Sequence, residues 1–170
     1  LDMDALAKFY IVQEITDNYE SFHGSCYLHK EIGANEQWHF GPLWDFDWGF
    51  GYESGSTYCY TGATSSVIKT SMAAYSFWQD LTNIELFKKH YYHVWKEFME
   101  NNSITELHDY IDSYYNFAKT SFQNNAYEWG SSCGFSESDR DRAKQWVEER
   151  ANYIYNNLDE YDVNDLIYTL

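Results

Sequence analysis

Apolar residues recur at every third or fourth position over much of the chain, and this spacing is typical of helices with one buried face. The pattern predicts five helices, over residues 2–19, 75–82, 84–100, 103 to about 123, and about 137–158. Asp2 or Asp4 is expected to cap the first helix and Asn83 the third, because a short acceptor side chain satisfies the free N–H groups of a first turn.

The fourth predicted helix begins with Ser103 and Glu106, which have the spacing of a capping box. Its apolar face is expected to consist of Leu107, Tyr110, Ile111, Tyr114 and Phe117. The segment AYEWGSSCGF, residues 126–135, contains two glycines and is expected to be a loop before the last helix.

Two short segments favour strands. Residues 25–30 (SCYLHK) lean towards β-structure, and Trp38 and Phe40 alternate with polar neighbours after a turn-like stretch. They predict a β-hairpin whose ladder ends at Pro42, since proline cannot donate to a sheet. Residues 51–75 are rich in Gly, Ser, Thr and Tyr and are expected to form a long loop. The sum is an α+β fold, mainly α, in a single domain over residues 1–170.

Charge excludes some classes of partner. The chain carries 27 acidic and 11 basic residues, a net charge of −16, and phosphate backbones and anionic membranes require a positive surface. Nucleic acid is therefore not expected as a partner, and no apolar run reaches the roughly 20 residues of a membrane span. The three cysteines lack the C-x-x-C spacing of a zinc site, and Cys59 and Cys133 lie in loop-like sequence where they could pair.

The segment GPLWDFDWGFG, residues 41–51, places two carboxylates among aromatic rings. In an extended segment Asp45 and Asp47 would share one face and the rings the other, because side chains alternate with period 2. A divalent cation relieves the repulsion between two adjacent carboxylates. The same pattern also occurs on the solvated face of an ordinary strand, so this motif alone leaves both interpretations open.

Other polar residues have weaker patterns. His29 and His39 are expected on paired strands, but their spacing fits no standard metal template, and a structural or surface role is preferred. His90 and His93 lie three apart on a helix and are expected at an interface with the core. Glu14, near the end of the first helix, is expected either to pair with a buried basic residue or to be solvated.

The aspartate motif carries a resemblance. FGPLWDFDWGFG, residues 40–51, resembles the hallmark of the CotH kinase family, the spore-coat-protein-H-like proteins. Further stretches resemble the same family along nearly the whole chain. They are DMDALAKFYIVQEIT (2–16), DNYESFHGSCYLHK (17–30), AYSFWQDLTNIELFKKHYYHVWKEF (74–98) and RAKQWVEERANYI (142–154).

The resemblance implies an atypical protein-kinase-like fold, of which this chain is similar to the C-terminal lobe, without the upstream lobe that covers the ATP phosphates. It implies phosphoryl transfer from ATP to protein serine with Mg²⁺ or Mn²⁺. Asp45 matches the family's metal aspartate, and Asp47 is the second carboxylate of the same run. These two residues are the expected metal and cofactor ligands.

The family's catalytic aspartate lies in an Asn–x–Asp pattern, and the matching stretch here is Asn18-Tyr19-Glu20. Glu20 therefore stands where an aspartate is expected, and Asp17 is the alternative occupant. The longer side chain moves the carboxylate by about 1 Å, and a displacement of that size can cost ~10²-fold in rate. The asparagine that often follows as a second metal ligand is not evident around Gly24 and Ser25.

Two functions follow from these features. One is a bacterial phosphotransferase, secreted or on the cell surface, that modifies a protein substrate; its leader peptide is not in this stretch. The other is a non-catalytic surface module in which the aromatic segment 50–62 contacts glycans or proteins. The altered residue at Glu20 favours the second, and the intact Trp–Asp–Phe–Asp run favours the first.

Overall fold

The computed structural model describes residues 1–18, 24–47, 49–51, 62–64 and 76–158. Five α-helices, one 3-10 turn and a two-stranded antiparallel sheet occur in these ranges, which confirms the α+β, mainly α class. In chain order they are α1 (Met3–Thr16), β1 (Leu28–Lys30), β2 (Trp38–Phe40), α3 (Ser76–Thr82), α4 (Glu85–Glu100), α5 (Ser103–Trp129), η1 (Ser131–Cys133) and α6 (Glu137–Tyr155). None of these described helices is both long and apolar enough to cross a membrane.

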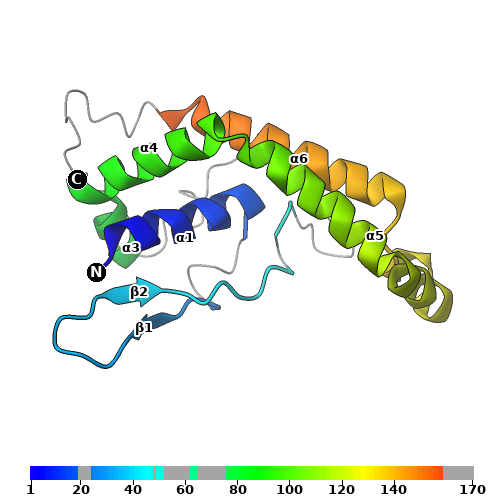
Figure 1. Cartoon of the computed structure of the whole chain (residues 1–170), viewed down its shortest axis with the longest axis horizontal. Helices are drawn as coiled ribbons and strands as arrows, with labels where there is room; N and C mark the ends of the chain where they lie inside the picture. Colours follow the sequence, from blue (N-terminus) through cyan, green and yellow to red (C-terminus); the bar gives the residue numbers. More distant parts are fainter. Residues whose placement is uncertain (19–23, 48, 52–61, 65–75, 159–170) are drawn as a thin grey trace.

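Helix α1 occupies the centre of the fold. It packs against α4 on one side and the hairpin on the other, and its C-terminal half also contacts α6 (Figure 1). Its buried residues therefore face several directions and include two polar side chains. They are Leu6, Ala7, Phe9, Tyr10, Ile11, Gln13, Glu14 and Ile15. The Tyr10 ring meets Phe87 and Tyr91 of α4 edge-on, at centroid distances of 5.4 and 5.5 Å.

The hairpin confirms the predicted strand pair. Leu28 lies opposite Phe40, His29 opposite His39, and Lys30 opposite Trp38. The Phe40 ring anchors the sheet to the helices, with centroids 5.7 Å from Phe9 and 4.9 Å from Trp78. The ladder ends beside Pro42 as predicted, with the Gly41 N–H donating to the Tyr27 carbonyl at 3.0 Å.

Helices α5 and α6 lie side by side and extend away from this core (Figure 1). Lys144 Nζ lies 2.6 Å from Asp112 Oδ2, and Arg140 Nε lies 3.3 Å from Asp112 Oδ1, so charged groups join the two helices. The predicted apolar face of α5 is wrong in part, because Tyr110, Tyr114 and Phe117 are 66, 53 and 87% exposed. Tyr115 is the buried residue of this helix.

Helix ends were predicted with mixed success. Asp2 caps α1, and its Oδ1 accepts the Ala5 N–H at 2.9 Å. The expected cap at Asn83 is wrong, since α4 follows Ile84 and has no side-chain cap. The capping box at Ser103 is also wrong: Asn102 occupies the N-cap in a left-handed conformation with no side-chain bond, and Ser103 is already helical.

The capping box of the structure is at α6, where the Ser136 hydroxyl accepts the Asp139 N–H at 3.2 Å and the Asp139 carboxylate accepts the Ser136 N–H at 2.8 Å. Helix α5 continues to Trp129, so part of the predicted loop at 126–135 is helical. Most of the predicted loop at 51–75, together with Cys59 and its proposed pairing with Cys133, lies outside the described residues.

Candidate functional site

The segment that follows β2 is a turn and not a strand. Residues 41–47 form no ladder, and Asp45 has a φ of 65°, in the left-handed region. A residue in that region breaks the alternation of side chains, so the strand-based interpretation of the Asp45–Asp47 run is wrong. Trp44 accordingly points to solvent, 56% exposed, and does not help to anchor the aspartates.

The turn nevertheless brings the two carboxyl groups together. A side-chain hydrogen bond joins Asp47 to Asp45 and, with a smaller contribution from burial and from the Asp45 charge, raises the pKa of Asp47. Two adjacent carboxylates hold either a shared proton or a cation, since both charges otherwise repel. The predicted pairing of these groups is therefore present, although its structural cause differs from strand alternation.

Two buried amides support Asp45 from the side of α1. The Asn18 Nδ2 donates to the Asp45 carbonyl at 2.9 Å and to Gln13 Oε1 at 3.2 Å. Asn18 and Gln13 are fully buried, at 0 and 1% exposure, so the turn is tied to a rigid part of the core. Sequence analysis placed Asn18 in the Asn–x–Glu pattern but did not assign it this supporting role.

Ser25 fixes the carboxylate itself. Its hydroxyl donates to Asp45 Oδ2 at 2.8 Å, which leaves the remaining lone pairs of the Asp45–Asp47 pair for other ligands. From the sequence, Ser25 was identified only as a position where the asparagine of the family pattern is missing. In the structure this position does reach Asp45, with a hydroxyl in place of an amide.

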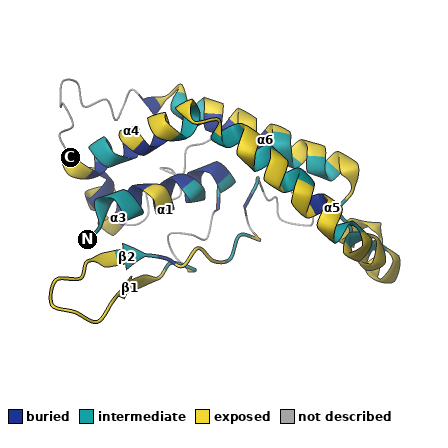
Figure 2. Ribbon diagram, in the orientation of Figure 1, coloured by how far each residue is buried: buried dark blue, intermediate teal, exposed yellow. Residues whose placement is uncertain are grey.

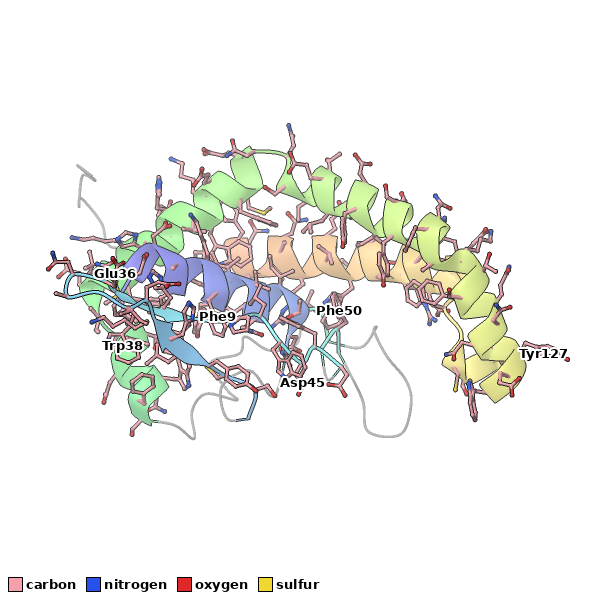
Figure 3. The ribbon with its side chains drawn as sticks, turned by 60° about the horizontal axis from the view of Figure 1, so that its bottom comes forward. Phe9, Glu36, Trp38, Asp45, Phe50 and Tyr127 are labelled. Carbon is pink, nitrogen blue, oxygen red and sulfur yellow. The ribbon has the colours of Figure 1, made fainter. Side chains whose placement is uncertain are left out.

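The glycine that closes the motif allows the turn to lie against the end of α1. The Gly49 N–H donates to the Phe46 carbonyl at 3.0 Å, and the Phe50 N–H donates to the Thr16 carbonyl at 2.5 Å. A Cβ on Gly49 would come within 3.1 Å of both carbonyl oxygens, so a larger residue would push the segment away. Figure 3 shows Asp45 and Phe50 together beneath this end of the helix.

Asp17, the alternative catalytic residue, belongs to a different arrangement. It ends α1 with a φ of 49°, and its Oδ1 accepts from Arg150 Nη2 at 3.1 Å. Burial raises the pKa of Asp17 more than the Arg150 charge lowers it. Among the described residues no hydrogen bond joins Asp17 to Asp45 or Asp47, so the two parts of the predicted site are not in direct contact.

Arg150 of α6 organises the end of α1. Its guanidinium is fully buried and donates from Nε to the Glu14 carbonyl at 2.9 Å and from Nη1 to the Ala63 carbonyl at 3.2 Å. The Glu14 side chain is also fully buried and accepts a hydrogen bond from the Tyr91 hydroxyl. The expectation of a solvated Glu14 is therefore wrong, because α4 and α6 cover this end of the helix.

The comparison with family models decides the assignment. The model described as CotH kinase protein matches residues 1–154 of the 170-residue chain. The chain belongs to the CotH kinase family. No curated protein and no solved structure gives a significant match. The match includes both the Asp45–Asp47 turn and the clamped end of α1, so both belong to the family's domain.

The acid pair of this CotH-family chain fits a hard divalent cation. Its donors are carboxylate oxygens, which Mg²⁺ and Mn²⁺ prefer, and the two groups are already adjacent. The described parts of the chain contain no group of three or more His, Cys, Asp or Glu residues placed to hold a metal. Two protein carboxylates with water and phosphate oxygens are a usual set for Mg²⁺, so the pair suffices as the protein's share.

The predicted catalytic residue Glu20 lies outside the described residues. Its role, and that of Asp17, Asp45 and Asp47, stays a prediction from the family resemblance.

Proposed function

We propose that this CotH-family domain takes part in phosphoryl transfer from ATP to protein serine, with Asp45 and Asp47 holding Mg²⁺ or Mn²⁺. The observation that carries the proposal is a turn that holds Asp45 by hydrogen bonds from Asn18 and Ser25, with Asp47 beside it. Adjacent carboxylates repel one another, and a cation between them relieves that repulsion. A bound ion would neutralise charge on the transferred phosphate.

In this proposal each residue around the acid pair has its own role. Asn18 fixes the Asp45 backbone, and Ser25 orients its carboxylate by donating to Oδ2 at 2.8 Å. The Asp47 carboxylate is the second ligand. Glu20 orients the acceptor hydroxyl, since the Asp17 carboxylate already accepts from Arg150 and is better suited to positioning the end of α1.

Binding of metal by this pair would depend on pH in a defined direction. Because the pKa of Asp47 is raised, acidification returns the shared proton at a higher pH than for an ordinary aspartate. The proton competes with the ion for the same oxygens, so affinity for the metal falls as pH falls through that pKa.

A second candidate is a non-catalytic module at the bacterial cell surface or outside the cell, binding a glycan or a protein. Large apolar side chains are exposed around the hairpin and the following turn. They are Tyr27, Leu28, Ile32, Trp38, Leu43 and Trp44. Exposed aromatic rings stack readily on sugars and other partners, and a glutamate at position 20 is consistent with loss of catalysis.

Calorimetric titration of the protein with ATP, in the presence of Mg²⁺ or Mn²⁺, separates the two candidates. We expect saturable, metal-dependent binding that is lost in Asp45→Asn, a change that removes the charge while keeping a residue tolerant of the left-handed φ of 65°. Asp109→Asn, at an exposed aspartate of α5, is the matched control and should bind as wild type. Metal-independent binding, or no binding by the natural protein that contains this chain, contradicts the proposal.

Transfer of the γ-phosphate to serine tests the role of Glu20. Glu20→Gln should abolish transfer while leaving metal–ATP binding intact, and Glu20→Asp should support transfer at least as well as the wild type. Binding without transfer in all three proteins would favour the non-catalytic module.

A further inference from the structure

The hairpin brings two histidines face to face. His29 of β1 and His39 of β2 are direct cross-strand partners, so both side chains leave the same face of the sheet. Their ring centroids are 5.7 Å apart, and the ring planes differ by 31°. His29 is exposed and the His39 side chain is 29% exposed, so solutes can reach the pair.

Each ring is held through its Nδ1 atom. The His29 Nδ1 lies 3.2 Å from the Gly41 carbonyl oxygen, and the His39 Nδ1 lies 3.5 Å from Asp2 Oδ2. A carbonyl oxygen only accepts, so in His29 Nδ1 carries the proton and Nε2 carries a lone pair when the ring is neutral. The nearby Asp2 carboxylate favours the same tautomer in His39. Neither Nε2 has a hydrogen-bond partner in the described part of the chain.

Asp2 is itself well anchored. Its Oδ1 accepts the Ala5 N–H at 2.9 Å, and its own N–H donates to the Trp38 carbonyl at 3.0 Å. Its second oxygen is thereby directed at His39, and the ring is oriented by the start of α1. Figure 1 shows this end of the helix next to β2.

This arrangement matches what metal-binding histidines require. Such residues almost always donate the other ring N–H to a carboxylate or a backbone carbonyl, and here one ring has each partner. Two imidazoles on a tetrahedral ion with metal–nitrogen bonds of about 2.0 Å have ring centroids roughly 5 Å apart. The observed 5.7 Å is within a small side-chain adjustment of that value.

We propose that His29 and His39 bind Zn²⁺, or a divalent ion of similar chemistry, through their Nε2 atoms. Water or a group from outside the chain completes the coordination, since no third His, Cys, Asp or Glu joins them among the described residues. The site is separate from the Asp45–Asp47 pair in chemistry as well as position, because imidazole nitrogen suits Zn²⁺ and carboxylate oxygen suits Mg²⁺. The proposal is independent of the phosphotransferase function.

Calorimetric titration of the chain with ZnCl₂ tests the site. We expect saturable binding that weakens at least about tenfold in His29→Ala and in His39→Ala, because each change removes one of two protein ligands. The double variant His90→Ala/His93→Ala removes two histidines from α4, one more than either hairpin variant, and should bind as wild type. Circular dichroism of each variant establishes that the fold is retained.

Two further variants identify the parts of the site. Asp2→Asn keeps an efficient N-cap and removes only the charge that faces His39, so Zn²⁺ affinity should fall by about tenfold. Asp45→Asn should leave Zn²⁺ affinity unchanged. In the NMR spectrum, Zn²⁺ should shift the ring signals of His29 and His39 before those of other histidines. Unchanged affinity in both hairpin variants, or loss in the α4 variant instead, overturns the proposal.

Discussion

Helices α1 and α5 have similar sequence patterns and opposite environments. Eight of the 14 residues of α1 are buried, whereas Tyr115 is the buried residue of the 27 in α5 (Figure 2). Both helices carry aromatic residues, Phe9 and Tyr10 in α1 and a longer series in α5. In α1 these rings form the core, but in α5 three of them, Tyr110, Tyr114 and Phe117, pack mainly along the helix surface.

The difference arises from the arrangement of the neighbouring elements. Helix α1 lies between α4 and the hairpin and also contacts α6, while α5 lies beside α6 and otherwise contacts only η1, which directly follows it, and α4 among the described elements. The polar contacts of the two helices differ in the same way, buried at α1 and partly exposed at α5. The end of α1 uses the fully buried Arg150, and α5 uses partly exposed ion pairs between Asp112 and α6. Spacing therefore predicts a helix, but the neighbouring elements decide which faces are covered.

The largest change in the free energy of unfolding is expected from Arg150→Met, at the end of α1. The change removes the guanidinium that donates to the Asp17 carboxylate and to the carbonyls of Glu14 and Ala63. Removing one partner of a buried ion pair typically costs 3–5 kcal/mol, so we expect a loss of about 4 kcal/mol in the free energy of unfolding, measured in urea.

Arg142→Met is the control on the same helix, because the Arg142 side chain is 47% exposed and pairs with Asp139 within one turn. It should change the free energy of unfolding by less than about 0.5 kcal/mol. Similar losses in the two variants would mean that the end of α1 is not clamped as described.

A smaller effect is expected within α5, where Tyr115→Ala and Phe117→Ala distinguish its two faces. Tyr115 is 4% exposed; its ring stacks on Phe122 and meets Phe135 at a tilt, with 6.2 Å between centroids in each pair. Its loss should cost about 3 kcal/mol, as for other buried aromatics. Phe117 is 87% exposed, and its replacement should cost less than about 0.5 kcal/mol. Equal costs would show that the outer face of α5 is covered in solution.

Much of the fold was predictable because local patterns determine it. Helical spacing gave all five helices, and alternation around Trp38 and Phe40 gave the hairpin. Helix starts were less predictable, since Asn83, Ser103 and Ser136 are all suitable caps and only Ser136 serves as one. Which polar residue caps a helix depends on the direction from which the chain enters it, and sequence spacing does not contain that information.

The residues of the candidate site were predictable from the sequence, but the backbone conformation that brings them together was not. The Asp-x-Asp run and its glycines pointed to a carboxylate pair, yet the pair arises from the left-handed Asp45. Contacts such as Ser25 with Asp45 and Arg150 with Asp17 span 20 and 133 residues. Tertiary packing creates these contacts, so no local pattern signals them. The Asn18 position was identifiable only through the family resemblance.

The smallest expected effect is on the pKa values of two ion-paired aspartates, Asp17 at the end of α1 and Asp112 of α5. The two pKa values should depart in opposite directions from the ordinary value of 3.8. Burial raises the pKa of Asp17 despite Arg150, whereas hydrogen bonding and the charge of Lys144 lower that of the partly exposed Asp112. Carboxyl ¹³C NMR across the acid range measures both. Asp112 should titrate below 3.8 and Asp17 above it.

The two aspartates should then affect stability with opposite signs. A depressed native pKa means that the Asp112 contribution is present above the unfolded value and is lost as pH falls through the native pKa. A raised native pKa means that the folded state binds the Asp17 proton more tightly than the unfolded chain does. Stability should therefore fall as pH rises from the unfolded value to the native pKa of Asp17, and Asp17→Asn should remove that part of the slope. Titration of both groups below 3.8 would instead mean that Arg150 outweighs burial, and that the end of α1 is as open to water as α5.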